Sequence, residues 1–158
     1  MAKALATLGG GCFWGIEAVF VKIDGVLETA VGYMGGDDDQ GTYEQVCSGK
    51  SGHAEVVQLI YDDQSVDYEA LLAVFWDCHD PTQMNRQGVD VGTQYRSVIF
   101  YHSQEQQKTA QRVITALNQC GRYDLKVATA VVEADRFHRA EDYHQQYLAR
   151  RGGGSCGI

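Results

Sequence analysis

The stretch Gly10-Gly11-Cys12-Phe13-Trp14-Gly15 decides how the first part of this chain folds. Two glycines before the cysteine permit a sharp backbone turn and the close approach of a ligand. The apolar residues behind this stretch recur at helical spacing: Ile16, Val19, Phe20 and Ile23. Because that spacing is typical of an amphipathic helix, we predict that Cys12 lies at or just before a helix N-terminus.

A cysteine at that position is a candidate reactive thiol. Unpaired backbone N–H groups and the positive end of the helix dipole favour a thiolate there. Phe13 and Trp14 could wall a small apolar pocket beside the sulfur. The alternative is that Cys12 is an inert residue buried under a glycine turn, as many free cysteines are. The residues alone leave both interpretations open.

Length and composition indicate one ordinary globular domain. The chain has 158 residues, of which 44% are hydrophobic and 22% charged, enough to build a core. Its formal net charge of −8 argues against nucleic acid as a partner, because no basic stripe is available for phosphates. We find no apolar run of the ~18 residues that a membrane span needs and no signal-peptide profile at the start. We therefore expect a soluble cytoplasmic protein in a reducing environment.

The cysteines and histidines match no metal template. The five cysteines are Cys12, Cys47, Cys78, Cys120 and Cys156, and no two form a CxxC pair. The five histidines are also scattered along the chain: His53, His79, His102, His138 and His144. Zinc sites usually show short ligand spacings, so we predict no metal, although a site assembled in three dimensions stays open.

Strand and helix patterns alternate along the rest of the chain. We expect strands over the N-terminal residues leading into the Cys12 turn and over 26–33, 54–61, 95–101 and 126–134. We expect helices from Asp67 to the stop at Asp80-Pro81, and from a capping box of Ser103 and Gln106. A final helix is predicted from the spacing of Ala140, Tyr143, Tyr147 and Leu148. The polar loop over 82–94 is long enough to suggest a functional role.

A carboxylate heads the apolar face of the strand over 54–61. Glu55, Val57, Leu59 and Tyr61 share one face under period-two geometry. Burial at that position would raise the pKa of Glu55 and keep it protonated, ready to donate a proton near neutral pH. The alternative, which the pattern alone favours, is that Glu55 lies in water at a frayed strand end.

Two glycine-rich segments remain. The acidic run over 35–41 could hold a cation, but a solvated surface loop is the simpler interpretation. The end of the chain, from Arg150 to Ile158, is too rich in glycine to fold alone. Its Cys156 sits on a tether that suits a thiol reaching for a second sulfur, whereas the alternative is a disordered end with an idle thiol.

Five segments in order resemble the signature segments of the peptide methionine sulfoxide reductase A family. They are Gly11-Cys12-Phe13-Trp14-Gly15, Gly52-His53-Ala54-Glu55-Val56-Val57, His79-Asp80-Pro81-Thr82-Gln83, Asp90-Val91-Gly92-Thr93-Gln94-Tyr95-Arg96-Ser97 and Ala140-Glu141-Asp142-Tyr143-His144-Gln145. Together they span nearly the whole chain.

The resemblance implies an α+β fold: a two-layer α/β sandwich around a mixed sheet, with a ferredoxin-like core and a long coiled C-terminal tail. It implies one domain over 1–158, in which 149–158 is the tail that carries a recycling cysteine. It also implies an enzyme that reduces methionine S-sulfoxide, free or in proteins, with no bound metal, flavin or nicotinamide cofactor.

The resemblance also implies roles for residues that contact the substrate. Cys12 matches the nucleophile that attacks the sulfoxide sulfur, and Glu55 matches the acid that protonates the departing oxygen. Tyr43 and Tyr95 match hydroxyls that assist Glu55. The remaining matches are substrate-binding residues: Phe13 and Trp14 around the methyl group, and Asp90.

Recycling of the oxidised enzyme follows from the same resemblance. The first step leaves Cys12 as a sulfenic acid, and Cys156 matches the thiol that condenses with it. Thioredoxin would then reduce the disulfide, and we expect the enzyme to be a monomer. The resemblance settles no role for Cys47, and Cys78 and Cys120 are taken as incidental.

Two other classes of function remain to be compared. A cysteine hydrolase would need a histidine that orients Cys12, for which His53 or His79 could be proposed. A non-enzymatic redox sensor could use a bond between Cys12 and Cys156 as its switch.

Overall fold

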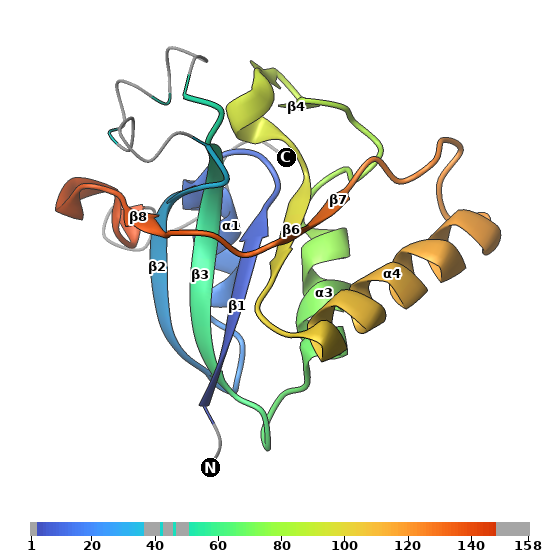
Figure 1. Ribbon diagram of the computed structural model, residues 1–158, viewed down its shortest axis with the longest axis horizontal. Coiled ribbons are helices and arrows are strands. Elements are labelled where there is room, and N and C mark those ends of the chain that lie inside the picture. The colour runs from blue at the N-terminus through green and yellow to red at the C-terminus, as the bar shows by residue number, and fades with distance from the viewer. Residues whose placement is uncertain (1–2, 37–41, 43–45, 47–50, 148–158) are drawn as a thin grey trace.

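A six-stranded sheet organises the protein (Figure 1). The computed structural model describes residues 3–36, 42, 46 and 51–147. The strands of this sheet, in spatial order, are β7 (Ala130–Glu133), β6 (Val98–Tyr101), β1 (Lys3–Gly9), β3 (Ala54–Asp62), β2 (Val26–Met34) and β8 (His138–Arg139). A separate hairpin pairs β4 (Arg86–Gln87) with β5 (Asp90–Val91). The helices are α1 (Phe13–Phe20), α3 (Tyr68–Asp77) and α4 (Gln104–Gln119), with 3₁₀ turns η1 (Thr93–Tyr95) and η2 (Asp142–His144).

The centre of the sheet has the connectivity of a ferredoxin-like fold. The chain runs β1-α1-β2-β3-α3-β6, while the strands lie side by side as β6-β1-β3-β2, each antiparallel to its neighbour. Strand β7 pairs with β6 in parallel, which makes the sheet mixed. The predicted α+β class, mixed sheet and ferredoxin-like core are therefore confirmed.

Local sequence signals explain where the longer helices begin. Asp67 Oδ1 accepts a hydrogen bond from the Ala70 amide at 2.7 Å and caps α3. Ser103 Oγ accepts from the Gln106 amide at 3.2 Å and caps α4. The Gln106 side chain returns to the amide of His102, one residue before the cap, at 2.9 Å. Ser103 and Gln106 thus form the predicted capping pair, except that the Gln106 side chain bonds the amide of His102 instead of that of Ser103.

Both faces of the sheet are covered. The main core packs residues of the sheet against the helices, and its fully buried members include Leu8, Phe20, Val57, Leu72 and Ile99. A smaller cluster contains Met34, Ala54, Val56, Val98 and Phe100, against which Phe137 packs. Figure 1 shows the connection from β7 to β8 crossing in front of the sheet. That crossing brings the C-terminal part of the chain back to β2, with which β8 pairs as the edge strand.

Four predicted elements differ from the structure. The last strand begins at Ala130 instead of 126, and β6 begins at Val98 because Thr93–Tyr95 forms a 3₁₀ turn. The predicted C-terminal helix is wrong over 140–146, where Ala140 follows β8 and Asp142–His144 forms η2. The reason is that the backbone there bonds to the sheet: the Ala140 amide donates to the Val31 carbonyl at 2.9 Å. The helix after Asp67 also ends earlier, at Asp77.

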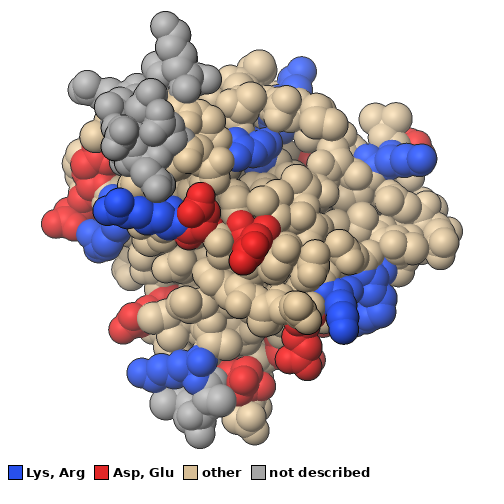
Figure 2. All heavy atoms as spheres, in the orientation of Figure 1, with Lys and Arg blue, Asp and Glu red and all other residues tan. Residues whose placement is uncertain are grey.

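The surface seen in Figure 2 carries separate acidic and basic side chains, and the described residues form no continuous basic stripe on that face. None of the helices in the described part of the chain is both long and apolar enough to cross a membrane. The acidic residues 37–39 lie outside the described residues.

Candidate active site

Cys12 is the N-cap residue of α1, as the sequence predicts. Strand β1 ends at Gly9, and the chain turns through Gly11 with φ of +98°. The Cys12 carbonyl accepts the first helical hydrogen bonds, from the amides of Gly15 at 3.2 Å and Ile16 at 3.4 Å. The residue is partly exposed. Cys12 therefore lies at the positive end of the helix dipole, where a thiolate is stabilised.

The two glycines before Cys12 admit close neighbours. A Cβ on Gly10 would lie 2.9 Å from the His79 ring, and one on Gly11 would lie 2.8 Å from Gln87 Cγ. Gln87 is buried, and its carboxamide bonds both the amide and the carbonyl of Asp80 at 2.7 Å. The loop over 80–87 is thereby held against the turn that presents Cys12.

Glu55 lies at the same helix end. It is only 2% exposed, and its Oε1 accepts a hydrogen bond from the Phe13 amide at 3.2 Å. The interpretation of Glu55 as a frayed strand end in water is therefore wrong. Strand β3 directs this carboxyl group to the face of the sheet on which α1 lies, and Tyr33 is opposite Glu55 in the register with β2. The structure thus places a buried acid beside the residue that follows Cys12.

An aromatic wall continues from Phe13 and Trp14. Phe13 is buried, with its ring centroid 5.6 Å from that of Tyr33. Trp14 Nε1 donates to His144 Nδ1 at 3.0 Å, and the Trp14 ring stacks on Tyr147 with centroids 3.9 Å apart. Because Nδ1 accepts this bond, neutral His144 carries its proton on Nε2. Burial lowers the pKa of His144, which favours that neutral form.

Sequence reasoning assigned no site role to three members of this wall. Tyr33, His144 and Tyr147 come from β2 and from the C-terminal segment, far from Cys12 in sequence. The one signal that pointed to His144 was its position in the fifth signature segment. Sequence reasoning placed Tyr147 on the buried stripe of a C-terminal helix, whereas the structure stacks its ring on Trp14.

The other predicted site residues lie as follows. Asp90 is in β5, opposite the buried Gln87 in β4, so the hairpin connects it to the Cys12 turn. Tyr95 ends η1, which packs against β3 and β4, and is partly buried. Tyr43, Cys47 and Cys156 lie outside the described residues.

The remaining described cysteines and His79 have structural environments. Cys78 is buried, and burial raises the pKa of its thiol to about 12, so it stays protonated. Cys120 is exposed at the end of α4. His79 uses both ring nitrogens, Nδ1 with the Phe75 carbonyl at 2.6 Å and Nε2 with Ser97 Oγ at 2.8 Å. This double engagement disfavours His79 as the orienting histidine of a cysteine hydrolase.

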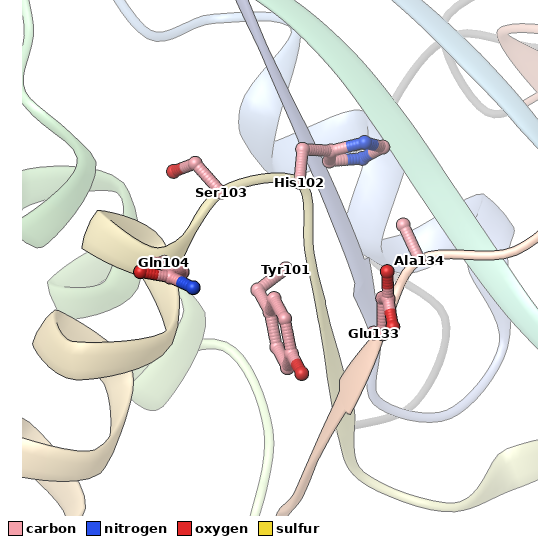
Figure 3. A pocket seen from close by; sticks show the side chains of 6 residues that line it. All are labelled: Tyr101, His102, Ser103, Gln104, Glu133 and Ala134. Carbon is pink, nitrogen blue, oxygen red and sulfur yellow. The ribbon is translucent and has the colours of Figure 1, made fainter.

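The pocket in Figure 3 lies elsewhere, at the corner between β6, α4 and β7. Its lining residues are Tyr101, His102, Ser103, Gln104, Glu133 and Ala134, none of which is a predicted site residue. Among the residues that the structure describes, no three His, Cys, Asp or Glu side chains cluster as a metal site would require.

Comparison with known proteins identifies the family. The family model described as "Peptide methionine sulfoxide reductase" matches residues 4–158. The chain belongs to the peptide methionine sulfoxide reductase family. The resemblance seen in the sequence is confirmed, and so is the expectation of an enzyme that reduces methionine sulfoxide with thiols.

Individual members of this family are similar over nearly the full length. The peptide methionine sulfoxide reductase MsrA of Methanoculleus marisnigri is 56% identical over 151 residues, which cover 96% of this chain and 92% of that protein. Reduced Mxr1 of Saccharomyces cerevisiae is 35% identical with a TM-score of 0.91, covering 98% of this chain and 89% of its own. Mxr1 in complex with Trx2 matches at 26% identity and a TM-score of 0.65, covering 92% of this chain and 84% of its own.

Proposed function

We propose that Cys12 is the nucleophile of this reductase and acts on methionine S-sulfoxide, free or in proteins. The thiolate attacks the sulfoxide sulfur, and the sulfoxide oxygen takes up a proton. Breaking the bond between sulfur and oxygen releases methionine and leaves a hydroxyl on the Cys12 sulfur as a sulfenic acid. Each turnover thus oxidises one thiol and reduces one sulfoxide.

The observation that supports this assignment is the buried Glu55 carboxyl at the N-terminus of α1. It contacts the amide of Phe13, the residue that follows the nucleophile. Its burial keeps the carboxyl group out of bulk water and next to the turn that carries Cys12. Glu55 is therefore the proton donor in the proposal, with Tyr43 and Tyr95 as assisting hydroxyls.

Substrate binding uses the aromatic wall. Phe13 and Trp14 would hold the methyl group of the sulfoxide, because the wall is apolar and is fixed by the bond between Trp14 and His144. Asp90 would position the polar part of the substrate from the β4–β5 hairpin.

Recycling would use Cys156 and thioredoxin. The Cys156 thiol attacks the Cys12 sulfenic acid, forming the S–S bond and releasing water. The dithiol of thioredoxin then reduces this disulfide by thiol–disulfide exchange and is itself oxidised to a disulfide. The complex of the relative Mxr1 with Trx2 supports this choice of reductant. We also propose that this single-domain enzyme works in the cytoplasm.

The test is chiral analysis of sulfoxide consumption with dithiothreitol as reductant. Wild type should consume only the S-epimer through many turnovers, which would also exclude a redox sensor. Cys12→Ser should show no turnover, because a serine hydroxyl is a far poorer nucleophile than a thiolate at neutral pH. Cys120→Ser is the matched control and should retain full activity. Substantial turnover by Cys12→Ser would disprove the mechanism.

A further inference from the structure

The C-terminal segment lies directly on α1, the helix that Cys12 caps. Of the four successive residues His144 to Tyr147, three contact α1 and Gln145 contacts β2; we call the four residues the C-terminal anchor. His144 accepts from Trp14 Nε1, and Tyr147 stacks on the Trp14 ring. The chain therefore leaves the described structure beside Trp14, two residues from Cys12.

A buried glutamate holds the middle of the anchor. Glu17 is 1% exposed and lies on α1. Its Oε1 accepts from the Gln146 amide at 2.5 Å, and its Oε2 accepts from Thr29 Oγ1 at 2.7 Å. Hydrogen bonds to a charged acceptor are stronger than neutral ones, and a buried donor left without its acceptor is costly. Glu17 thus joins α1, β2 and the C-terminal anchor in one contact.

The adjacent residue fastens the anchor to the sheet. The Gln145 carboxamide accepts from the Val31 amide at 2.8 Å and donates to the carbonyls of Val31 and Ala140, each at 2.9 Å. Gln146 itself has φ of +50°, which is uncommon for a residue other than glycine. Such a conformation persists only where its surroundings determine it, and here Glu17 and Gln145 do so from either side.

We propose that Glu17 and Gln145 are positioning residues for the resolving step, and this inference rests on the proposed roles of Cys12 and Cys156. They fix the origin of the tail beside Trp14 and so raise the effective concentration of the Cys156 thiol at the Cys12 sulfenic acid. The reaction they assist forms the S–S bond, breaks the S–O bond of the sulfenic acid and releases water that carries the thiol proton.

Tether length gives the size of the effect. Cys156 lies 9 residues after Tyr147, but 17 residues after Arg139, the last residue of β8. If the anchor were released, the tether would begin near Arg139 and be almost twice as long. Effective concentration falls roughly as the −3/2 power of tether length, so disulfide formation should slow about threefold or more.

The experiment separates the two steps of a single turnover. Enzyme is mixed with saturating methionine sulfoxide and no reductant; methionine release and formation of the Cys12–Cys156 disulfide are followed in time. In Glu17→Ala, Gln145→Ala and the double variant, methionine release should slow less than disulfide formation, because saturating substrate offsets weaker binding at the aromatic wall. Disulfide formation should slow, by about threefold in the double variant, while a sulfenic-acid reagent traps more of the intermediate.

Two variants serve as controls. Glu17→Gln keeps an oxygen that can accept from the Gln146 amide and should restore most of the disulfide rate. Gln106→Ala removes a buried side chain that bonds the Leu5 carbonyl at 2.7 Å, away from the C-terminal anchor. It should cost stability without changing the disulfide rate. Gln145→Ala leaves α1 intact and carries the test if Glu17→Ala does not fold.

Three results would overturn the inference. The first is disulfide formation at the wild-type rate in the double variant. The second is equal slowing of both steps, which would indicate a general structural role. The third is slowing by Gln106→Ala to the same degree. The proposed function would fail differently: wild type would release no methionine, or Cys12 would still form a disulfide with another cysteine in the Cys156→Ser variant.

Discussion

Cys12 and Cys78 show how placement alone separates two identical side chains. Cys78 is buried, its thiol donates to the Phe75 carbonyl, and burial raises its pKa to about 12. Cys12 is partly exposed and sits at the amino end of a helix. A thiolate is disfavoured in the first environment and stabilised in the second. Chemistry that needs a thiolate can therefore use Cys12 and not Cys78.

At the same scale, replacing Glu55 tests the proton donor. Glu55→Gln keeps the shape of the side chain but removes the acid, so the chemical step should slow by roughly 10²- to 10⁴-fold. The measurement is methionine formation in a single turnover. Glu28→Gln, at an exposed position of β2, is the control and should be unaffected. An unchanged rate in Glu55→Gln would make Glu55 structural and leave the tyrosines to supply the proton.

His79 makes stability depend on pH. Its Nδ1 must donate to the Phe75 carbonyl, so neutral His79 accepts at Nε2 from Ser97. Burial lowers the pKa of His79 to about 4, against an ordinary value of 6.5. The unfolded chain thus binds more protons between these values. The stabilising contribution is complete above about pH 6.5 and is lost as the pH falls towards 4.

The measurable consequence is a difference between two proteins. From pH 7 to 4.5, wild type should lose about 2 to 3 kcal/mol more unfolding free energy than His79→Gln, which does not titrate. Urea unfolding at both pH values gives the comparison. Other titrating groups affect both proteins equally and cancel. Equal losses in the two proteins would show that His79 is not held neutral.

At the scale of elements, the turn between β1 and α1 requires glycine for two reasons. Gly11 has φ of +98°, and a Cβ there would lie 2.8 Å from Gln87 Cγ. Gly11→Ala should therefore destabilise the protein by about 1–3 kcal/mol and displace Cys12, with a loss of reductase activity.

Gly121 provides the matched control for that substitution. Its φ is +78°, but an added Cβ would meet nothing within 4 Å. Gly121→Ala should show the backbone cost alone, about 1 kcal/mol, with full activity. Thermal unfolding and dithiothreitol-dependent turnover of both variants make the test. Full activity in Gly11→Ala would mean that the turn does not control the position of Cys12.

The C-terminal segment shows why helical spacing misled at this scale. Ala140, Tyr143 and Tyr147 are spaced as on a helix, yet Ala140 bonds β2 and Tyr147 stacks on Trp14. The helical spacing therefore arises from contacts with two different elements, because Ala140 contacts the sheet and Tyr147 contacts α1. Periodicity cannot separate this case from a helix, because it does not identify where the backbone hydrogen bonds go.

At the scale of the whole molecule, the proposed recycling step requires Cys156, near the end of the chain, to reach Cys12, near its start. Cys156→Ser should still release one methionine per enzyme, since the first step needs only Cys12. It should then stop as the sulfenic acid, because thioredoxin needs a disulfide to attack. Dithiothreitol should restore turnover.

A burst measurement followed by trapping of the sulfenic acid checks this prediction. Cys120→Ser is again the control and should turn over fully with thioredoxin. If Cys156→Ser also turns over fully with thioredoxin, another cysteine must resolve the intermediate, and Cys47 would be the first to test.

The sequence by itself determined the fold class, the family and the candidate nucleophile at a helix start. Glycine turns, capping residues and apolar periodicity act over a few residues, so the helix start at Cys12 and the caps at Asp67 and Ser103 follow from local chemistry. Five ordered segments were enough for the family because each is specific in composition and spacing.

Only the tertiary structure decided which side chains share the site. Glu55 could have been solvated or buried, and the packing of α1 on that face of β3 decided that it is buried. Tyr33 and His144 reach α1 from distant parts of the chain, and no local pattern predicts their burial or that of Glu17 on α1 itself. Such contacts depend on strand register and on the path of the C-terminal segment, which are properties of the packed molecule.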